Sequence, residues 1–397
     1  MYQKSIVKSG SIFVLMITLL SVFAACKKEV KPEDAFVKVY NEQGGNTIYN
    51  PLSIRKTPDQ GYLILSAFDG WKIQLMKIDK LGDFEWKYNL PDTYVNAVPN
   101  IIIRGGNYYF VCMDQVGLFA KVMQININAK NATEVKDFPY VLYPTAVFAS
   151  EQSIFLQNYN RSSYQTEIYK LNETLTDTLL SGKVDVLDNV EERLVDHITF
   201  AGKRMPFFIS ETPEADHVVM SGFYKYSFSL IFMDENLDFT GVYNGSNYNG
   251  GMNAILPLGN SNYALARYSY SSLYFNPLTF IDPTAIAMGE SIGANGVPEI
   301  DASKPVLIKS LNLDSKKLVA CITSTQSNQV LIQFYDSKTG ELKGKKYVGQ
   351  NIPFTVADAA TSASGELILL VQATIMGGYK RIATIKIDKE QINRTIE

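Results

Sequence analysis

The sequence contains few of the side chains on which metal and redox chemistry depend. Among 397 residues there are two His, three Cys and two Trp. Two His cannot form a multi-His metal site within one chain. Lys and Arg number 37 and Asp and Glu number 40, so there is no basic excess to hold a phosphate backbone. We therefore expect no nucleic-acid partner.

Motifs of the common cofactor-binding loops are also missing. There is no phosphate-binding loop and no glycine fingerprint for a dinucleotide, while the Gly-x-Ser-x-Gly pattern of a nucleophile elbow occurs once, at 289–293. Calcium loops of the Asp-x-Asp-x-Asp-Gly type are absent as well. We expect no cofactor and no metal, and we favour a binding protein over an enzyme.

What the chain does contain is an ordinary globular composition with many aromatic rings. Apolar residues make up 46% of the chain and charged residues 19%, which excludes disordered, collagen-like and coiled-coil proteins. Nearly all aromatic residues are Tyr (24) or Phe (21). Both favour β-strands, so the composition indicates a strand-rich protein.

The first 25 residues have the pattern of a lipoprotein signal peptide. Two Lys residues precede an apolar run over 12–23, which is too short for a permanent transmembrane helix. Two Ala residues then lead directly into Cys26. This ending resembles the lipobox of bacterial lipoproteins, although Phe23 stands where a Leu is usual. The resemblance implies cleavage before Cys26 and lipidation of its thiol. The alternative is an ordinary secretory peptide with an incidental Cys.

The tract 26–34 is charged and contains a Pro, so we expect a solvated tether. Its Lys and Glu residues resemble the tethers of Bacteroidota outer-membrane lipoproteins, and Lys27 stands where an Asp would suggest inner-membrane retention. The resemblance implies a protein held on the outer membrane by lipid on Cys26, and several acyl chains on one Cys give stable anchoring. We favour the cell surface over the periplasm.

A unit of four strands recurs along the rest of the chain, 35–397. Residues 61–88 have the pattern of three strands separated by two turns, and a further strand precedes each such unit. The third strand of every unit ends in an apolar residue followed by Asp or Asn. These anchor residues lie 46 to 62 positions apart, at Asp79, Asn126, Asn172, Asp234, Asp282, Asp336 and Asp388. This spacing is typical of β-propeller blades, so we predict an all-β, seven-bladed β-propeller of four-stranded blades. Stacked β-sandwiches are the alternative.

The ring of blades has to be closed, and the N-terminal strand suits that role. Residues 35–40 resemble the outer strand 84–88 and precede any strand of their own unit. We expect them to pair with the last blade, because the first and last sheets of a ring keep unpaired strand edges unless the two ends of the chain share a blade. An extra edge strand without closure is the alternative. The longest interval holds an insertion around 185–203, which we expect to be a long loop with a helical turn in a chain almost free of helix.

The hairpins after two anchor residues resemble those of a known repeat family. Asp79-Lys-Leu-Gly82-Asp-Phe-Glu-Trp86 and Asp336-Ser-Lys-Thr-Gly340 are similar to the Asp-x-x-Gly-x-x-x-Trp hairpin of quinoprotein-like β-propellers. Only the first keeps the Trp, and most other units lack the Gly. Together with the strand at 61–64, these hairpins look like those of propeller lipoproteins of Bacteroidota. The resemblance implies an architecture and no particular activity.

Loops that join second to third strands share one face of a propeller with the loops between blades. On this face we expect a surface for a ligand or partner, made of Trp71, Tyr159, Tyr164, Tyr224, Tyr226, Tyr248, Tyr270 and Tyr274. Loops of the opposite face, such as 80–82 and 314–317, are charged and turn-like. Tyr, Asn and Ser make adaptable contacts at low entropic cost, which suits sugar rings or extended peptides. The alternative is that these Tyr residues pack between blades.

Three functions are compatible with these features. We favour a non-enzymatic, outer-membrane-anchored binding lipoprotein, an accessory of a TonB-dependent transporter that takes up glycan or peptide. The second is a propeller scaffold for outer-membrane protein assembly, which would bind partner chains by β-augmentation. The third is a hydrolase or lyase whose carboxylates meet at the ring axis from distant blades.

Three further side chains carry separate expectations. Cys112 and Cys321 lie in apolar runs of units that are not adjacent. We expect two buried free thiols that act as small apolar groups rather than a disulfide. Thr178 lies in Asp177-Thr178-Leu179, which resembles the short O-glycosylation sites of Bacteroidota, and it is a candidate for that modification.

Overall fold

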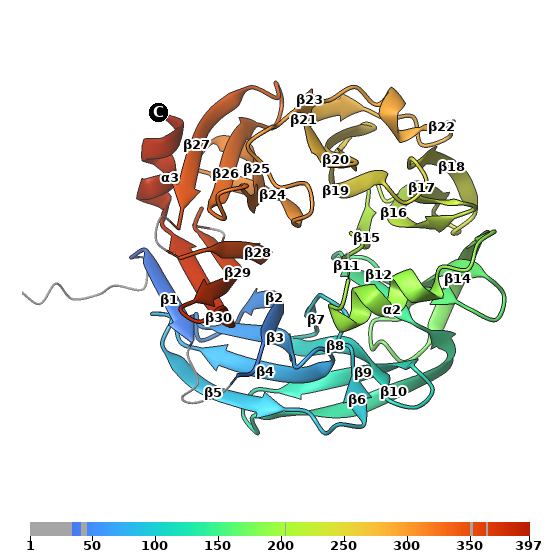
Figure 1. Ribbon diagram of the computed structural model, residues 1–397, viewed down its shortest axis with the longest axis horizontal. Helices are drawn as coiled ribbons and strands as arrows, with labels where there is room; N and C mark the ends of the chain where they lie inside the picture. Colours follow the sequence, from blue (N-terminus) through green and yellow to red (C-terminus); the bar gives the residue numbers. More distant parts are fainter. Residues whose placement is uncertain (1–33, 41–45, 203, 350–351, 363) are drawn as a thin grey trace, which may run out of the picture. The chain divides into compact units, whose positions relative to one another are not determined.

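The computed structural model describes residues 34–40, 46–202, 204–349, 352–362 and 364–397. The predicted signal peptide, Cys26 and the predicted tether up to residue 33 lie outside these residues. Residues Ala35–Glu397 form one compact unit. Its strands make seven separate sheets that are arranged around a common axis (Figure 1). The unit is a seven-bladed β-propeller, as the spacing of the anchor residues predicts.

Each blade is numbered here from its place along the chain, with its innermost strand first. Blade 1 consists of β2 (Tyr49–Lys56), β3 (Tyr62–Phe68), β4 (Lys72–Ile78) and β5 (Phe84–Asn89). Blade 2 consists of β6 (Tyr94–Val95) and β7 (Ile102–Arg104), which both pair with β8 (Asn107–Asp114), then β9 (Phe119–Asn126) and β10 (Asn131–Leu142). Blade 3 consists of β11 (Pro144–Ala149), β12 (Ile154–Asn160), β13 (Gln165–Leu171) and β14 (Thr178–Asp185). Blade 4 consists of β15 (Phe208–Glu211), β16 (His217–Tyr224), β17 (Ser227–Asp234), β18 (Phe239–Asn244) and, parallel to β18, β22 (Ile286–Met288).

The remaining three blades complete the ring. Blade 5 consists of β19 (Gly250–Gly259), β20 (Asn262–Ser269), β21 (Ser272–Phe280) and β23 (Asn295–Gly296). Blade 6 consists of β24 (Val306–Leu313), β25 (Lys316–Ser324), β26 (Val330–Asp336) and β27 (Leu342–Val348). Blade 7 consists of β28 (Phe354–Thr361), β29 (Leu367–Ile375), β30 (Tyr379–Ile387) and the N-terminal strand β1 (Phe36–Tyr40).

The anchor residues recur because each one organises the turn into the next element. The Oδ1 atom of Asp79 accepts hydrogen bonds from the backbone N–H groups of Leu81 and Asp83, both at 2.8 Å. Equivalent bonds are made by Asn172, Asp234 and Asp336. A short Asp or Asn side chain that bonds the backbone two to four residues onward stabilises a tight turn. The Asp or Asn therefore recurs along the sequence because these turns need its side chain.

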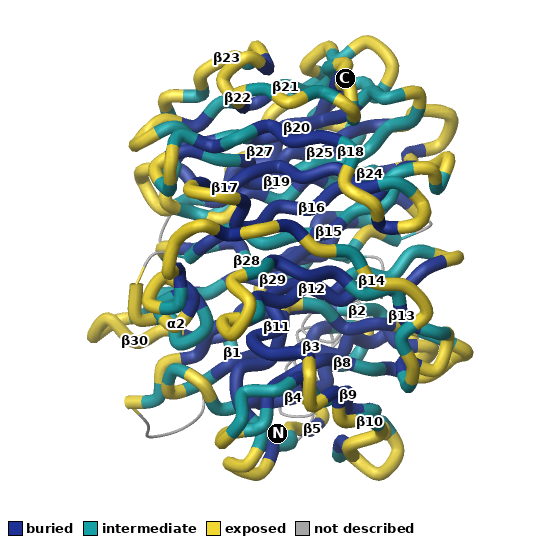
Figure 2. Tube along the Cα trace, turned by 90° about the vertical axis from the view of Figure 1, so that its right-hand side faces the viewer, coloured by how far each residue is buried: buried dark blue, intermediate teal, exposed yellow. Residues whose placement is uncertain are grey.

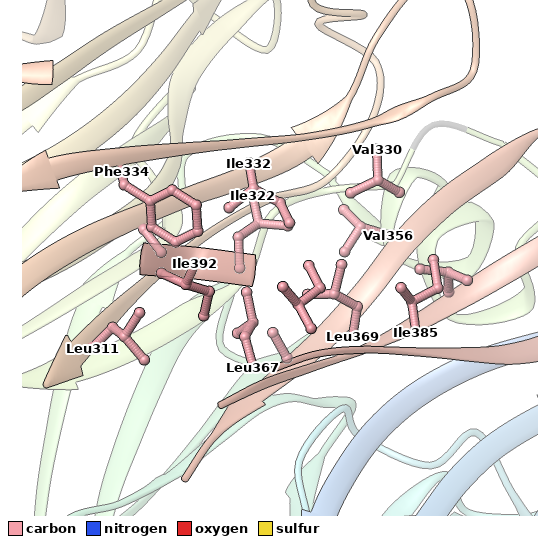
Figure 3. Close-up of a cluster of buried hydrophobic side chains, with 14 of the residues drawn as sticks. Leu311, Ile322, Val330, Ile332, Phe334, Val356, Leu367, Leu369, Ile385 and Ile392 are labelled. Carbon is pink, nitrogen blue, oxygen red and sulfur yellow. The ribbon is translucent and has the colours of Figure 1, made fainter. Parts of the chain in front are cut away.

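The hydrophobic core is divided among the interfaces between blades. Strands in the middle of a blade are covered on both faces, so β3 is buried at six of seven positions, whereas the outer strand β5 buries only Trp86. Figure 2 shows this as buried strand interiors beneath exposed loops. A separate apolar cluster joins each neighbouring pair of blades. In the cluster between blades 6 and 7, Ile392 packs against residues such as Phe334 and Leu367 (Figure 3).

Strand β1 completes the last blade. It pairs antiparallel with β30, with Phe36 opposite Lys386 and Tyr40 opposite Ile382. The hydroxyl of Tyr40 donates a hydrogen bond to the carbonyl oxygen of Gly82 in blade 1 at 2.9 Å. The N-terminal strand therefore contacts both the last blade and the first, which holds the two ends of the ring together.

The structure contains more helix than the sequence indicates. The insertion forms a nine-residue helix, α2 (Glu191–Thr199), instead of a single helical turn. A second helix, α3 (Lys389–Ile396), follows blade 7 directly and packs against β27. Its first turn is capped by the last anchor residue, Asp388, which accepts a hydrogen bond from the N–H of Gln391 at 2.7 Å. A short 3₁₀ turn, η1, covers Gly289–Ser291.

The two described Cys residues are free and fully buried. Cys112 packs between blades 1 and 2, and Cys321 packs between blades 5 and 6. Burial raises the pKa of both thiols, that of Cys321 to about 12. The expectation of two buried free thiols is confirmed. In the described part of the chain, no helix is long and apolar enough to cross a lipid bilayer.

Candidate binding face

Four of the predicted aromatic residues lie at equivalent positions on one face of the ring. They occupy the tips of the hairpins β3–β4, β12–β13, β16–β17 and β20–β21, which join second to third strands. We call this side the hairpin-tip face. The four side chains are 47% to 72% exposed and are Trp71, Tyr164, Tyr226 and Tyr270. The structure thus presents rings from blades 1, 3, 4 and 5 to solvent on the same side.

Two of the predicted residues are buried, and they belong to the core instead. Tyr159 is 1% exposed and Tyr224 is 8% exposed. Tyr159 packs edge-on against Phe223 at a centroid distance of 6.2 Å, beneath the insertion. Tyr224 stacks nearly parallel on Phe239 at 5.6 Å. For these two residues the packing interpretation is correct, because strand-end rings are covered by neighbouring segments that the sequence alone does not place.

Tyr248 and Tyr274 are half-exposed, and each carries an arginine over its ring. The guanidinium of Arg193 lies 4.1 Å from the ring centroid of Tyr248, and that of Arg267 lies 4.2 Å from Tyr274. The hydroxyl of Tyr248 donates a hydrogen bond to Asp188 Oδ2 at 2.8 Å. Burial and this bond raise the pKa of Tyr248. Its hydroxyl is therefore a permanent donor at neutral pH.

The insertion is fixed to the ring by an ion pair at the start of α2. Glu191 Oε1 accepts hydrogen bonds from the hydroxyl of Tyr143 at 2.7 Å and from Arg161 Nη1 at 3.0 Å. These two partners lower the pKa of Glu191.

At the other end of the helix His197 is buried, and its Nδ1 accepts a hydrogen bond from the N–H of Met205 at 3.0 Å. Burial and the nearby Arg204 lower the pKa of His197 well below 6.5, so it remains a neutral structural residue.

A pocket of about 390 Å³ opens on the hairpin-tip face between the insertion and blades 4 and 5. Its lining residues are Asp188, Arg193, Tyr226, Asn247, Tyr248 and Asn249. Of these six, only Tyr226 and Tyr248 belong to the surface predicted from the sequence. The run of Asn residues around Tyr248 was a signal for the two amides. Nothing in the sequence pattern places Asp188 and Arg193 beside them, because that contact depends on how the insertion folds back.

The opposite face is less uniform than the sequence suggests. Its loops do carry exposed charges such as Lys80 and Lys316. However, Phe84 and Phe280 at that end are 54% and 67% exposed. The expected contrast between an aromatic face and a purely charged face therefore holds for Tyr and Trp but not for Phe.

The innermost strands of the blades gather one ion cluster at the ring axis. Asp358 on β28 accepts hydrogen bonds from Arg55 Nη1 on β2 at 2.8 Å and from Lys309 Nζ on β24 at 3.3 Å. Burial by itself would raise the pKa of Asp358, but Lys309, Arg55 and two backbone N–H groups outweigh it and lower the pKa to about 2. Among the described innermost strands the other acidic residue is Glu211, on β15 of blade 4. An ionised carboxylate held by two cations has the chemistry of a structural ion pair, not of a general acid.

Two remaining expectations concern single sites. The described residues contain no group of three or more His, Cys, Asp or Glu side chains that could hold a metal ion. Thr178 is half-exposed at the start of the outer strand β14, with its Oγ1 atom 2.9 Å from the hydroxyl of Tyr140. Its glycosylation stays a prediction.

Comparison with known proteins identifies the fold and no family. No protein-family model matches the chain, and no curated protein sequence does. Among solved structures, Drosophila Semaphorin 2a is similar over 91% of this chain and 76% of its own, at 8% identity and a TM-score of 0.50. The β-propeller domain of the Trilobed protease from Pyrococcus furiosus matches over 86% of this chain and 95% of its own, at 9% identity and a TM-score of 0.46. The S. cerevisiae core factor matches over 93% of this chain at 7% identity and a TM-score of 0.49, and this chain spans 63% of that one.

Proposed function

We propose that this protein is a non-enzymatic binding lipoprotein, held on the outer membrane by lipid on Cys26, that captures an extracellular ligand with its hairpin-tip face. The observation that carries the proposal is the set of exposed rings at equivalent hairpin tips, next to a pocket on the same side. Trp and Tyr are the residues that most often dominate the binding energy of an interface. Exposed rings on a rigid ring of blades therefore indicate a recognition surface.

The chemistry of the ring axis supports binding over catalysis. A hydrolase or lyase with paired carboxylates needs a second acid within reach of the first. Both carboxylate oxygens of Asp358 instead accept hydrogen bonds, from Arg55, Lys309 and backbone N–H groups. The two acidic residues of the described innermost strands, Glu211 and Asp358, lie in blades 4 and 7, which are not neighbours. In addition, the pKa of Asp358 is too low for a proton donor at neutral pH.

The anchor is proposed from the sequence before the propeller. The apolar run 12–23 followed by two Ala and Cys26 is the pattern of a cleaved and lipidated N-terminus. A tether over 26–34 would then connect the lipid to β1, which begins at Phe36. On this arrangement, we propose that the protein serves a TonB-dependent transporter as the component that captures glycan or peptide.

The experiment is fractionation and protease treatment of cells that carry the wild-type chain or the C26A variant. We expect the wild type in the outer-membrane fraction and accessible to protease added to intact cells, and C26A in the soluble fraction. Membrane association of C26A equal to that of the wild type would contradict lipid anchoring. Complete protection of the wild type in intact cells would contradict capture at the cell surface and would favour the periplasmic assembly scaffold.

A further inference from the structure

The pocket on the hairpin-tip face has rigid backbone walls. The N–H of Leu187 donates to the carbonyl oxygen of Lys225 at 2.9 Å, which ties the insertion to the hairpin tip of blade 4. The loop between blades 4 and 5 is fixed from both sides. The N–H of Phe228 donates to Asn247 O at 3.0 Å, and that of Tyr270 donates to Asn249 O at 2.7 Å. A ligand that enters this pocket meets walls already ordered, which reduces the entropy lost on binding.

The polar groups that line the pocket keep hydrogen-bonding capacity for a ligand. The guanidinium of Arg193 lies over the ring of Tyr248, 4.1 Å from its centroid, and within the described residues it forms no hydrogen bond or ion pair. Asp188 uses Oδ2 for the hydroxyl of Tyr248, while its Oδ1 accepts no bond from a described residue. The side-chain amides of Asn247 and Asn249 likewise have no partner in the described part of the chain. Each amide offers both donors and an acceptor.

The pocket also presents an exposed aromatic ring. The ring of Tyr226 is 60% exposed and makes no ring contact with another described aromatic residue. Its backbone is nevertheless held in place, because the N–H of the preceding Lys225 donates to Asp185 O at 2.8 Å. An exposed ring on a fixed backbone is a platform for a flat apolar surface.

We infer that this pocket is a binding subsite for the uncharged hexose rings of a glycan. The inference rests on the proposed binding function and names its ligand class. Sugar hydroxyls donate and accept at the same atom, so they match a set of amides, a carboxylate and a guanidinium. The C–H face of a pyranose ring stacks on an exposed Tyr ring. Among the described lining residues one Asp and one Arg balance each other, which favours a neutral sugar over a uronate or sulfated one. A volume of about 390 Å³ lies within the range of small-ligand sites.

A peptide is the less favoured occupant. Extended peptides are commonly bound by backbone hydrogen bonds along an open strand edge. Here the backbone of the walls is already engaged, since Val186 and Lys225 form a β-bridge and the loop at 247–249 bonds to Phe228 and Tyr270. What remains available in the pocket are side-chain amides, ions and a ring face.

The test is an array of neutral hexose oligosaccharides, uronate oligosaccharides and peptides, probed with the detergent-purified full-length chain, with titration of each hit. We expect binding to neutral oligosaccharides, weakened about ten- to a hundred-fold by Y226A and by N249A. Y226F keeps the ring and should stay within about threefold of the wild type. The matched control is F280A, an exposed ring on the opposite face, which should leave affinity unchanged.

The outcomes separate this inference from the function on which it rests. Loss of neutral-oligosaccharide binding in Y226A and N249A with an unchanged melting temperature supports the subsite. Binding of peptides alone, weakened by Y226A, overturns the sugar assignment and leaves the binding face in place. Binding of uronates in preference to neutral sugars overturns the argument from charge. No binding to any member of the array, or equal losses in Y226A and F280A, overturns both the subsite and the proposed function.

Discussion

The ion cluster at the ring axis gives a sharp test of what holds the first and last blades together. Asp358 of blade 7 accepts hydrogen bonds from Arg55 Nη1 at 2.8 Å and Ile54 N at 3.1 Å in blade 1, and from Lys309 Nζ at 3.3 Å in blade 6. The D358N variant preserves the shape of this side chain and removes the charge that both cations face. We expect it to form the same ring and to unfold more readily.

The magnitude follows from the pKa of Asp358 and from its partners. The pKa falls from 3.8 to about 2 in the folded protein. One pKa unit corresponds to about 1.4 kcal/mol, so the carboxylate adds roughly 2 kcal/mol to the free energy of unfolding at neutral pH. D358N also leaves two cations without a counter-charge, and breaking a buried pair costs about 3–5 kcal/mol in total. Because the side chains of Arg55 and Lys309 are 24% and 30% exposed, we expect a smaller loss of about 2–4 kcal/mol.

The sign of the pH dependence is fixed by the same values. A depressed carboxyl pKa means that the folded protein binds the proton less readily than the unfolded chain does. The stabilisation is therefore complete well above the unfolded pKa of 3.8 and is lost as pH falls toward the folded value of about 2. At about pH 3 roughly half of it should remain.

The assay is urea unfolding followed by circular dichroism, at about pH 7 and at about pH 3, for the wild type, D358N and D83N. Asp83 pairs with Lys38 at 2.7 Å, but its side chain is 62% exposed, and exposed pairs contribute less than about 1 kcal/mol. D358N should lose far more stability than D83N at neutral pH, and its deficit should shrink in acid. Equal losses in the two variants, or a D358N deficit that does not shrink, would show that the charge of Asp358 does not stabilise the ring.

Three further outcomes are expected. Deletion of residues 35–40 should remove hydrogen-exchange protection from β28–β30 more than from β16 and β17, because β1 pairs with β30. An equal change of protection in all these strands would show that β1 does not stabilise the last blade. Cys112 and Cys321 should resist a thiol reagent in the native protein and react after denaturation, since both are buried with raised pKa values; fast native labelling would contradict the packing. Tyr224→Ala should lower stability by about 3–5 kcal/mol without weakening ligand binding beyond the effect of unfolding, because the ring is 8% exposed and packs in the apolar cluster between blades 3 and 4. A loss of affinity at unchanged stability would place Tyr224 in the site.

The architecture could be predicted because its signals are local. Blades 1 to 6 each end the third strand with an Asp or Asn that closes the following turn, as Asp79 does for Leu81 and Asp83. That requirement acts over a few residues, so it recurs visibly in the sequence. Helix α3 was missed for a related reason, because Asp388 looks like every other anchor residue and nothing nearby shows that it caps a helix instead of a turn.

The binding face was only partly predictable because burial depends on distant segments. Tyr226 and Tyr224 are two residues apart, yet one is exposed and the other is stacked on Phe239. The pocket joins Asp188 to Tyr248, which lie 60 positions apart in the sequence. The cluster of Arg55 and Asp358 spans 303 positions. Contacts of this length depend on ring closure and on the path of the insertion, and no local pattern encodes them.

The hairpin-tip face is tested most directly by comparing two double variants on the array of oligosaccharides and peptides. W71A/Y226A removes two exposed rings from this face, and K80A/K316A removes two exposed charges from the opposite face. We expect binding about ten- to a hundred-fold weaker for W71A/Y226A at an unchanged melting temperature, and an affinity within about twofold of the wild type for K80A/K316A. Weaker binding by K80A/K316A together with full affinity in W71A/Y226A would show that the ligand binds the other side of the ring.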